Sequence, residues 1–286
     1  MGSMKNIGII GKSGKQEPAV IVRELLPWLA RKGCKVYVDS ETASFTKCEG
    51  TPRSQIPSLV DFIIVLGGDG TMLSVSRLVG DKEIPILGVN IGGLGFLTAV
   101  QKDEVYEVLE KVLAGECTVE DRIMLTACVL RHSECIAEHV VVNDVVVNKG
   151  ALARIIDLET YIDHNYVATF KADGLIVSTP TGSTAYALSA GGPILYPTLN
   201  TIVLAPICPH TLTNRPIVLP DNVLVEIVLR SQNEDVFLTL DGQVGFSLKQ
   251  GDIVVVKKSL HRAKIFIPCE RDYYKILRTK LKWGER

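Results

Sequence analysis

The sequence predicts an α/β N-terminal domain built on a parallel sheet, followed by a β-sandwich-like C-terminal domain. In the first third of the chain, short apolar runs alternate with segments of helical periodicity, which is typical of parallel α/β sheets. After about Asp121, Val- and Ile-rich runs succeed one another with short polar turns, which favours an antiparallel sandwich. The expected boundaries are residues 4–120, completed by 265–286, for the first domain and residues 121–264 for the second.

Strands are expected where short Ile- and Val-rich runs occur, and helices where apolar residues recur at helical spacing. The expected strands of the first domain are residues 6–10, 35–38, 61–66 and 84–89. The expected helices are residues 17–32, a helix that begins at Thr71, residues 102–114, and residues 273–282, which return to the first domain. The expected strands of the second domain are residues 124–130, 136–148, 155–162, 166–170, 174–178, 201–206, 222–229 and 236–240.

Composition indicates a globular chain with a substantial core, because 47% of its 286 residues are hydrophobic. Lys and Arg number 31 against 32 for Asp and Glu, so no broad charge favours nucleic acid or an anionic membrane as a partner. No apolar stretch is long enough to span a membrane, and no signal-peptide core follows the N-terminus. The seven cysteines are odd in number and form no CxxC pair, which predicts a reduced, cytoplasmic protein.

The segment Gly67-Gly68-Asp69-Gly70-Thr71 follows a buried, Ile- and Val-rich run directly. Glycines without a β-carbon can adopt positive φ and leave room for a ligand against the main chain, and a helix starting at Thr71 would offer amides to phosphate. A carboxylate at a phosphate site needs a reason, either to hold Mg²⁺ or to accept a proton from an attacking hydroxyl. A tight strand-to-helix turn is the alternative interpretation.

The loop after the first expected strand, residues 11–15 (GKSGK), resembles a phosphate loop at first sight. It does not match G-x-x-x-x-G-K-[ST], because Ile9 occupies the first glycine position and Gln16 the hydroxyl position. The loop can still contribute a glycine turn or a lysine near phosphate.

Residues 178–193 are unusually rich in Ser and Thr, and the segment also contains Gly182 and Tyr186. Hydroxyl groups suit the edges of a polar ligand, and a tyrosine ring offers a flat surface for a base. A loop that caps a short helix is the alternative. Asn143-Asp144 interrupts a valine-rich run, which suggests a bulge or a ligand contact, with a plain turn between two strands as the alternative.

These motifs occur in the order and approximate spacing of the NAD kinase family, which the chain resembles over nearly its whole length. The resemblance continues through residues 93–97, 206–216 and 241–243. GGDG alone is shared with diacylglycerol kinases and phosphofructokinases, whereas TPTGSTAY at 179–186, followed by SAGGP and CPHTLTNRP, is specific. The resemblance implies a Rossmann-like or phosphofructokinase-like first domain and an NAD-binding second domain.

The resemblance also implies a reaction, the transfer of the γ-phosphoryl group of ATP, or of polyphosphate, to the 2′-hydroxyl of the adenosine ribose of NAD. Asp69 would be the general base, and Asp69→Asn would abolish activity while folding and NAD binding stay largely intact. Mg²⁺ or another divalent cation would be carried by ATP, with no protein side chain assigned as a metal ligand.

The resemblance assigns ribose hydroxyls to Asn143 and Asp144, and a charged pair to Lys171 and Asp173. Lys171 stands where the family often has Arg, which keeps the charge and loses the bidentate fork. The full set of implied binding residues is Gly68, Asp69, Gly70, Phe96, Asn143, Asp144, Arg154, Lys171, Asp173, Thr184, Ala185, Tyr186, Ala187, Leu188, Ser189 and Gln243.

The implied partners are small-molecule nucleotides and further copies of the chain, in a homodimer or homotetramer whose sites borrow residues from a neighbouring subunit. Two other functions stay open at this point. One is an NAD(P)-binding sensor that has lost catalysis. The other is a lipid or sugar kinase that shares GGDG, although the 179–186 segment has no role in it.

Overall fold

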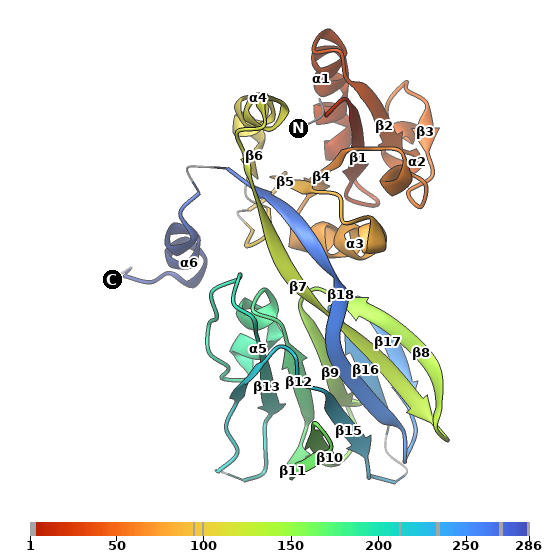
Figure 1. The fold of residues 1–286 in the computed structure, drawn as a ribbon, viewed down its shortest axis with the longest axis vertical. Helices are drawn as coiled ribbons and strands as arrows, with labels where there is room; N and C mark the ends of the chain where they lie inside the picture. Colours follow the sequence, from red (N-terminus) through yellow and green to blue (C-terminus); the bar gives the residue numbers. More distant parts are fainter. Residues whose placement is uncertain are drawn as a thin grey trace. The chain divides into compact units, whose positions relative to one another are not determined.

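The computed structural model of the chain (Figure 1) describes residues 4–93, 95–98, 100–211, 213–232, 235–268 and 271–284. Leu94 and Leu212, which belong to two segments that carry the family resemblance, lie outside the described residues. The chain forms two compact units, which are described separately below. Unit 1 contains Met1–Asp121 and Ala263–Arg286, and unit 2 contains Arg122–Arg262.

Unit 1 is an α/β unit on a parallel sheet, as predicted (Figure 1). Its strands are β1 (Asn6–Gly11), β2 (Lys35–Asp39), β3 (Gly50–Thr51), β4 (Phe62–Gly67), β5 (Ile86–Asn90) and β6 (Val100–Gln101). They lie in the order β3-β2-β1-β4-β5, with β6 beside β5, and every pair is parallel. The C-terminal part of β18 (Ile253–Ile267) joins the same sheet, where Ile265 pairs with Ile86.

Helices cover both faces of this sheet. The helices are α1 (Glu17–Arg31), α2 (Ser40–Ser44), α3 (Asp69–Val79), α4 (Val105–Ala114) and α6 (Tyr273–Leu281), with short 3₁₀ turns at Ile56–Ser58, Gly80–Lys82 and Lys102–Glu104. Apolar side chains of α1 and α4 share one core cluster with Leu87 and Val89 of β5. Gly88 lies between Leu87 and Val89 in β5 and therefore faces the other side of the sheet. Met72 of α3 lies against Gly88 on that side. Burial on both faces explains the continuous apolar run of β4.

Unit 2 is an antiparallel sandwich of two sheets. Its remaining strands are β7 (Thr118–Arg131), β8 (Glu134–Val141), β9 (Asp144–Lys149), β10 (Ile156–Ile162), β11 (Asn165–Ala172), β12 (Gly174–Ser178), β13 (Thr201–Ile207), β14 (Ile217–Pro220), β15 (Val225–Leu229), β16 (Val236–Leu240) and β17 (Val244–Leu248). One sheet has the order β14-β13-β12-β9-β16-β17, and the other contains β11-β10-β15-β18 with β7 paired to β18 and β8. Side chains from both sheets form one core, which confirms the predicted sandwich.

Several predicted elements differ from the structure. The expected strand 136–148 is two strands, β8 and β9, because the chain turns at Val142 and Asn143. Helix α3 begins at Asp69 rather than at Thr71, so the carboxylate lies in its first turn. Strands β3, β14, β17 and β18 and the short α2 were not predicted. In β18, charged residues such as Lys257 and Arg262 interrupt the apolar pattern.

The cysteines correct one expectation. Cys128 and Cys135 of the β7–β8 hairpin form a disulfide, with their Cα atoms 6.2 Å apart, so the prediction of a fully reduced chain is wrong for this pair. Among the described residues, Cys34, Cys48 and Cys208 form no disulfide. In the part of the chain that the structure describes, no helix is both long and apolar enough to cross a membrane.

Candidate functional site

A polar pocket of about 260 Å³ lies in unit 1, beyond the carboxyl ends of β1, β4 and β5. These three strands are adjacent and parallel, which is the arrangement that places ligand sites at one edge of an α/β sheet. The pocket is lined by Lys12, Lys15, Glu17, Gly67, Gly68, Asn90, Ile91, Gly92 and Gly93.

The loop between β1 and α1 supplies the two lysines of this pocket, so the resemblance of GKSGK to a phosphate loop has a structural counterpart. The amide of Lys12 donates to the carbonyl of Leu66 at 2.9 Å, which fixes the loop beside the end of β4. Both Lys12 and Lys15 are exposed. With two lysines against the single carboxylate of Glu17, and with glycine backbone beside them, the lining suits an anion.

The glycines of GGDG do not adopt unusual φ, and Gly67 instead serves close packing. None of Gly67, Gly68 and Gly70 has positive φ, so that expectation is wrong. A β-carbon at Gly67 would lie 2.4 Å from the hydroxyl of Thr71, which folds back over it from α3. A β-carbon at Gly68 would meet nothing within 4 Å, so here the main chain borders open space in the pocket.

The carboxylate of Asp69 is held by the backbone of the segment 96–98. Its Oδ1 accepts from the amides of Leu97 at 2.9 Å and Thr98 at 3.2 Å. Its Oδ2 accepts from the amide of Phe96 at 2.8 Å. A β-carbon at Gly95 would lie 2.2 Å from Oδ1, so this position must be glycine for the carboxylate to fit. Asp69 therefore anchors a loop as well as bordering the GGDG turn.

Asn90, a residue that the sequence did not single out, braces the opposite wall of the pocket. Its Nδ2 donates to the carbonyl of Gly93 at 2.5 Å and to the hydroxyl of Thr98 at 3.0 Å, and its Oδ1 accepts from the amide of Gly92 at 2.7 Å. Asn90 is the last residue of the buried strand β5. A polar side chain at the end of an apolar run was the sequence signal that could have identified it as a site residue.

A second pocket, of about 370 Å³, lies in unit 2 beside the neighbouring strands β9 and β16 in the interior of the six-stranded sheet. It brings together four of the implied binding residues, Asn143, Asp144, Ala185 and Tyr186. It is completed by residues that the sequence analysis did not assign: Val146, Asn148, Thr239, Asp241 and Gly242.

Asp241 explains the break between β8 and β9. Its carboxylate accepts from the amides of Val142 at 3.1 Å, Asn143 at 2.7 Å and Asp144 at 3.2 Å. Asp241 and Gly242 both have positive φ, in the turn between β16 and β17. An Asp-Gly pair between two apolar runs predicts such a turn, although not the contact with residues almost 100 positions away.

Asn143 carries an acceptor prepared for a ligand. Its Oδ1 is buried and has no hydrogen-bond partner among the described residues. Since buried polar atoms are nearly always paired, this atom is available to accept a hydrogen bond from a ligand in the pocket.

The carboxyl group of Asp144 is electrostatically strained. Burial raises its pKa, the negative charge of Asp241 raises it further, and the amide of Tyr186 opposes the shift, giving a pKa of about 7. The cause is desolvation first, because the side chain is buried. At neutral pH this group is poised between an acceptor-only carboxylate and a carboxylic acid that can also donate.

The segment 182–189 divides between pocket and core. Tyr186 is 45% exposed as a residue and borders the pocket, which is compatible with stacking on a ligand. The side chain of Ala187 is fully buried in a core cluster, so it does not face a ligand. Thr184, Leu188 and Ser189 are not part of the pocket lining, and the hydroxyl of Thr184 donates to the carbonyl of Thr181.

The expected charged pair of Lys171 and Asp173 does not form. Lys171 instead lies 3.8 Å from Asp157, its direct cross-strand neighbour, and Asp173 lies 3.4 Å from Lys149. Residues facing each other across two strands are closer than residues two apart along one strand, which is the reason for the exchange.

Two further implied residues, Arg154 and Gln243, are exposed and lie outside the lining of the unit 2 pocket. Among the described residues, no group of three or more His, Cys, Asp or Glu side chains is arranged to hold a metal ion. Lys12, Lys15 and the glycine backbone of unit 1 suit an anion rather than a metal ion.

Family models cover both units. A model described as ATP-NAD kinase N-terminal domain matches residues 7–117, and one described as ATP-NAD kinase C-terminal domain matches residues 142–268. A protein named NAD kinase from Geotalea daltonii is 52% identical over 284 residues, which cover 99% of this chain and 100% of that protein. A protein of the same name from Geobacter sulfurreducens is also 52% identical, with the same coverage of both chains.

Solved structures agree. Yeast NADH kinase complexed with NADH has a TM-score of 0.93 at 26% identity, covering 100% of this chain and 90% of that one. An NAD kinase from Archaeoglobus fulgidus in complex with ATP has a TM-score of 0.78 at 25% identity, covering 97% and 98%. With both family models matched in order and half of all residues shared with full-length relatives, the chain belongs to the NAD kinase family.

Proposed function

We propose that the protein transfers the γ-phosphoryl group of ATP to the 2′-hydroxyl of the adenosine ribose of NAD, producing NADP and ADP. The observation that carries this proposal is the likeness, over 99% of the chain, to proteins named NAD kinase. The two pockets support it independently, because one suits phosphates and the other suits a nucleoside with hydroxyl groups.

The unit 1 pocket would take the phosphates of the donor. Lys12 and Lys15 supply positive charge, and the bare backbone at Gly68 lets a phosphate approach closely. Mg²⁺ or another divalent cation, bound to ATP, would neutralise the charge that develops between the β- and γ-phosphates. Polyphosphate presents the same chemistry to these groups, so it is the alternative donor.

Asp69 would receive the proton of the ribose hydroxyl. Its Oδ1 is occupied by two amides, whereas Oδ2 accepts one amide from Phe96 and keeps a lone pair. As the 2′-oxygen forms its bond to the γ-phosphorus and the bond to the β,γ-bridging oxygen breaks, the proton passes to Oδ2. The amides fix the carboxylate before the substrate arrives, which is the condition for efficient proton transfer.

The unit 2 pocket would bind NAD. The unpartnered Oδ1 of Asn143 accepts from a ribose hydroxyl, and Asp144 holds a second hydroxyl. Tyr186 stacks on a base, and Thr239 and Asn148 add polar contacts within the same pocket. Asp241 holds the Asn143-Asp144 backbone in place and acts through it.

The first experiment is direct. We expect the purified protein to form NADP from NAD, ATP and Mg²⁺, with NADH and polyphosphate tested as alternative substrates. In parallel with the assay, isothermal titration calorimetry measures the binding of NAD. Binding of NAD without any NADP formation would favour the sensor function instead, and absence of both would contradict the proposal.

The donor assignment gives a second prediction. Lys12→Met and Lys15→Met are each expected to raise KM for ATP by about tenfold, the effect of losing one charge-assisted contact. KM for NAD stays unchanged, because NAD binds elsewhere. Lys102→Met, which removes an exposed lysine outside the pocket, is the matched control. If all three variants have the same KM for ATP, the donor does not bind in this pocket.

We also propose a cytoplasmic location and a homodimeric or homotetrameric state, both on the family resemblance. Exposed apolar side chains on unit 2, among them Leu152 and Leu260, support association. Light scattering coupled to size-exclusion chromatography measures the assembly.

A further inference from the structure

We propose that Arg53 is a positioning residue for phosphoryl transfer: it clamps the β1–α1 loop so that Lys12 and Lys15 are held over the GGDG backbone. The identity of the donor rests on the function proposed above, whereas the clamp rests on the contacts of unit 1 alone. Arg53 does not line the pocket and would not touch the donor.

The lysine-bearing loop needs an external support. Residues 12–16 are all exposed, so no apolar packing orders them. A loop of this kind pays conformational entropy on ligand binding unless its conformation is fixed beforehand. The two lysines can act on a phosphate group only if the backbone beneath them keeps one conformation.

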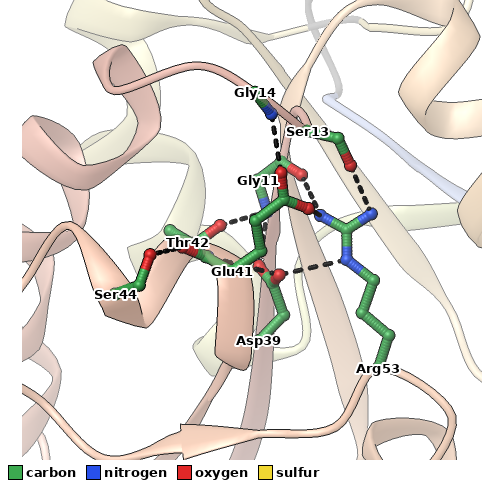
Figure 2. A network of polar contacts seen from close by, with 8 residues as sticks. All are labelled: Gly11, Ser13, Gly14, Asp39, Glu41, Thr42, Ser44 and Arg53. Atoms are coloured by element: carbon green, nitrogen blue, oxygen red, sulfur yellow. Dashed lines mark hydrogen bonds and ion pairs between the residues drawn. The ribbon is translucent and has the colours of Figure 1, made fainter.

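Arg53 supplies that support through three separate atoms (Figure 2). Its Nε donates to Oδ1 of Asp39 at 3.0 Å, one terminal nitrogen donates to the hydroxyl of Ser13 at 2.9 Å, and the other donates to the carbonyl of Gly11 at 2.7 Å. The guanidinium thus joins the end of β2 to both sides of Lys12 in sequence. A lysine could not reproduce this planar fork.

Acidic groups complete the clamp from the N-terminal end of α2 (Figure 2). Glu41 accepts from the amide of Gly14 at 2.7 Å and lies 3.4 Å from Arg53. The Gly14 amide, the Ser13 hydroxyl and the Arg53 charge hold the pKa of Glu41 below its usual value. The amide of Gly11 also donates to Asp39 at 3.0 Å and to the hydroxyl of Thr42 at 3.1 Å, so side chains hold the loop at Gly11 as well as at Ser13 and Gly14.

Arg53 also neutralises the charge of Asp39 and so contributes to stability. The experiment must separate this contribution from the positioning of the loop. Asp39 is fully buried, and Arg53 is 31% exposed. Unit 2 contains a matched pair, since Arg131 is 25% exposed and binds Asp252, which is 1% exposed, through two hydrogen bonds of 2.8 and 2.7 Å. Arg131→Met therefore removes an equivalent ion pair without touching the loop.

The test compares Arg53→Met, Arg53→Lys and Arg131→Met in steady-state kinetics, with thermal unfolding of each. We expect both Arg53 variants to raise KM for ATP by about tenfold, while kcat and KM for NAD change less than about threefold. Arg131→Met is expected to lower Tm to a similar extent and leave KM for ATP unchanged. Full recovery of KM in Arg53→Lys, or an equal rise in Arg131→Met, would overturn the positioning role.

A double-mutant cycle shows whether Arg53 acts through the lysines. In the Lys12→Met/Lys15→Met background, Arg53→Met is expected to add less than about twofold to KM for ATP, because the groups it positions are gone. Independent, multiplicative effects would show that Arg53 attracts the donor directly and would refute the clamp.

Binding of inorganic tripolyphosphate, measured by calorimetry, separates this inference from the proposed reaction. We expect Arg53→Met to weaken binding about tenfold even if no NADP is formed, which would leave the clamp standing and remove the reaction. If Arg53→Met forms NADP normally and binds tripolyphosphate as the parent does, the positioning role of Arg53 is refuted while the proposed reaction stands. If the parent protein binds no tripolyphosphate, the pocket is not a phosphate site and the inference fails.

Discussion

Asp69→Asn is expected to lower kcat for NADP formation by about 10²- to 10⁴-fold, the usual consequence of losing a general base. The substitution also has a structural cost that the sequence did not predict. Both carboxylate oxygens accept backbone amides, so the NH₂ group of Asn must face an N–H wherever it is placed. Loss of one such contact destabilises by about 1–3 kcal/mol, and Tm falls accordingly.

The two effects can be separated with a variant that disturbs the same loop and keeps the carboxylate. Asn90→Ala removes the bonds to Gly92, Gly93 and Thr98 and leaves Asp69 unchanged. It is expected to lower Tm as much as Asp69→Asn does while retaining at least about a tenth of kcat. Because Asn90 also lines the donor pocket, kcat is compared at saturating ATP. If Asn90→Ala lowers this kcat as much as Asp69→Asn does, the carboxylate serves as a loop anchor and another group accepts the proton.

Local patterns predicted the elements and motifs that lie close together in sequence. The run of β4 followed at once by GGDG specified a strand, a tight turn and a pocket, because continuous burial and small residues are both visible in a short window. The 178–193 segment likewise indicated a polar site, and Ala185 and Tyr186 do border the unit 2 pocket.

Distant contacts account for what the sequence did not reveal. Asp241 is separated by 99 residues from Val142, which it binds, and Arg53 by 42 residues from Gly11. Nothing near either residue distinguishes a buried structural acceptor or clamp from a solvated charge. The pairing of Lys171 with Asp157 has the same origin, since cross-strand register depends on the whole sheet.

The buried carboxyl group of Asp144 is expected to make stability depend on pH. Its folded-state pKa of about 7 lies above its ordinary value of 3.8, so between these values the unfolded chain releases a proton that the folded chain retains. The free energy of unfolding contributed by this group is therefore greatest at low pH and is lost as pH rises toward and through 7. A shift of this size corresponds to about 4 kcal/mol across the window.

Asp144→Asn removes the titration while keeping the shape of the neutral acid. We expect the variant to unfold at a higher denaturant concentration than the parent at pH 8, with the advantage disappearing near pH 4. Asp157→Asn changes the net charge equally at a half-exposed position and serves as the control. An identical pH profile for parent and Asp144→Asn would show that Asp144 ionises freely in the fold.

The same substitution is expected to cost function where it restores stability. Asn cannot present two acceptor oxygens, so KM for NAD rises by about tenfold or more if Asp144 accepts from a ribose hydroxyl. A protein that keeps a strained carboxyl beside Asp241 gives up stability at neutral pH, and such a loss is commonly retained where binding requires it. Higher stability with unchanged KM for NAD would assign Asp144 no part in substrate binding.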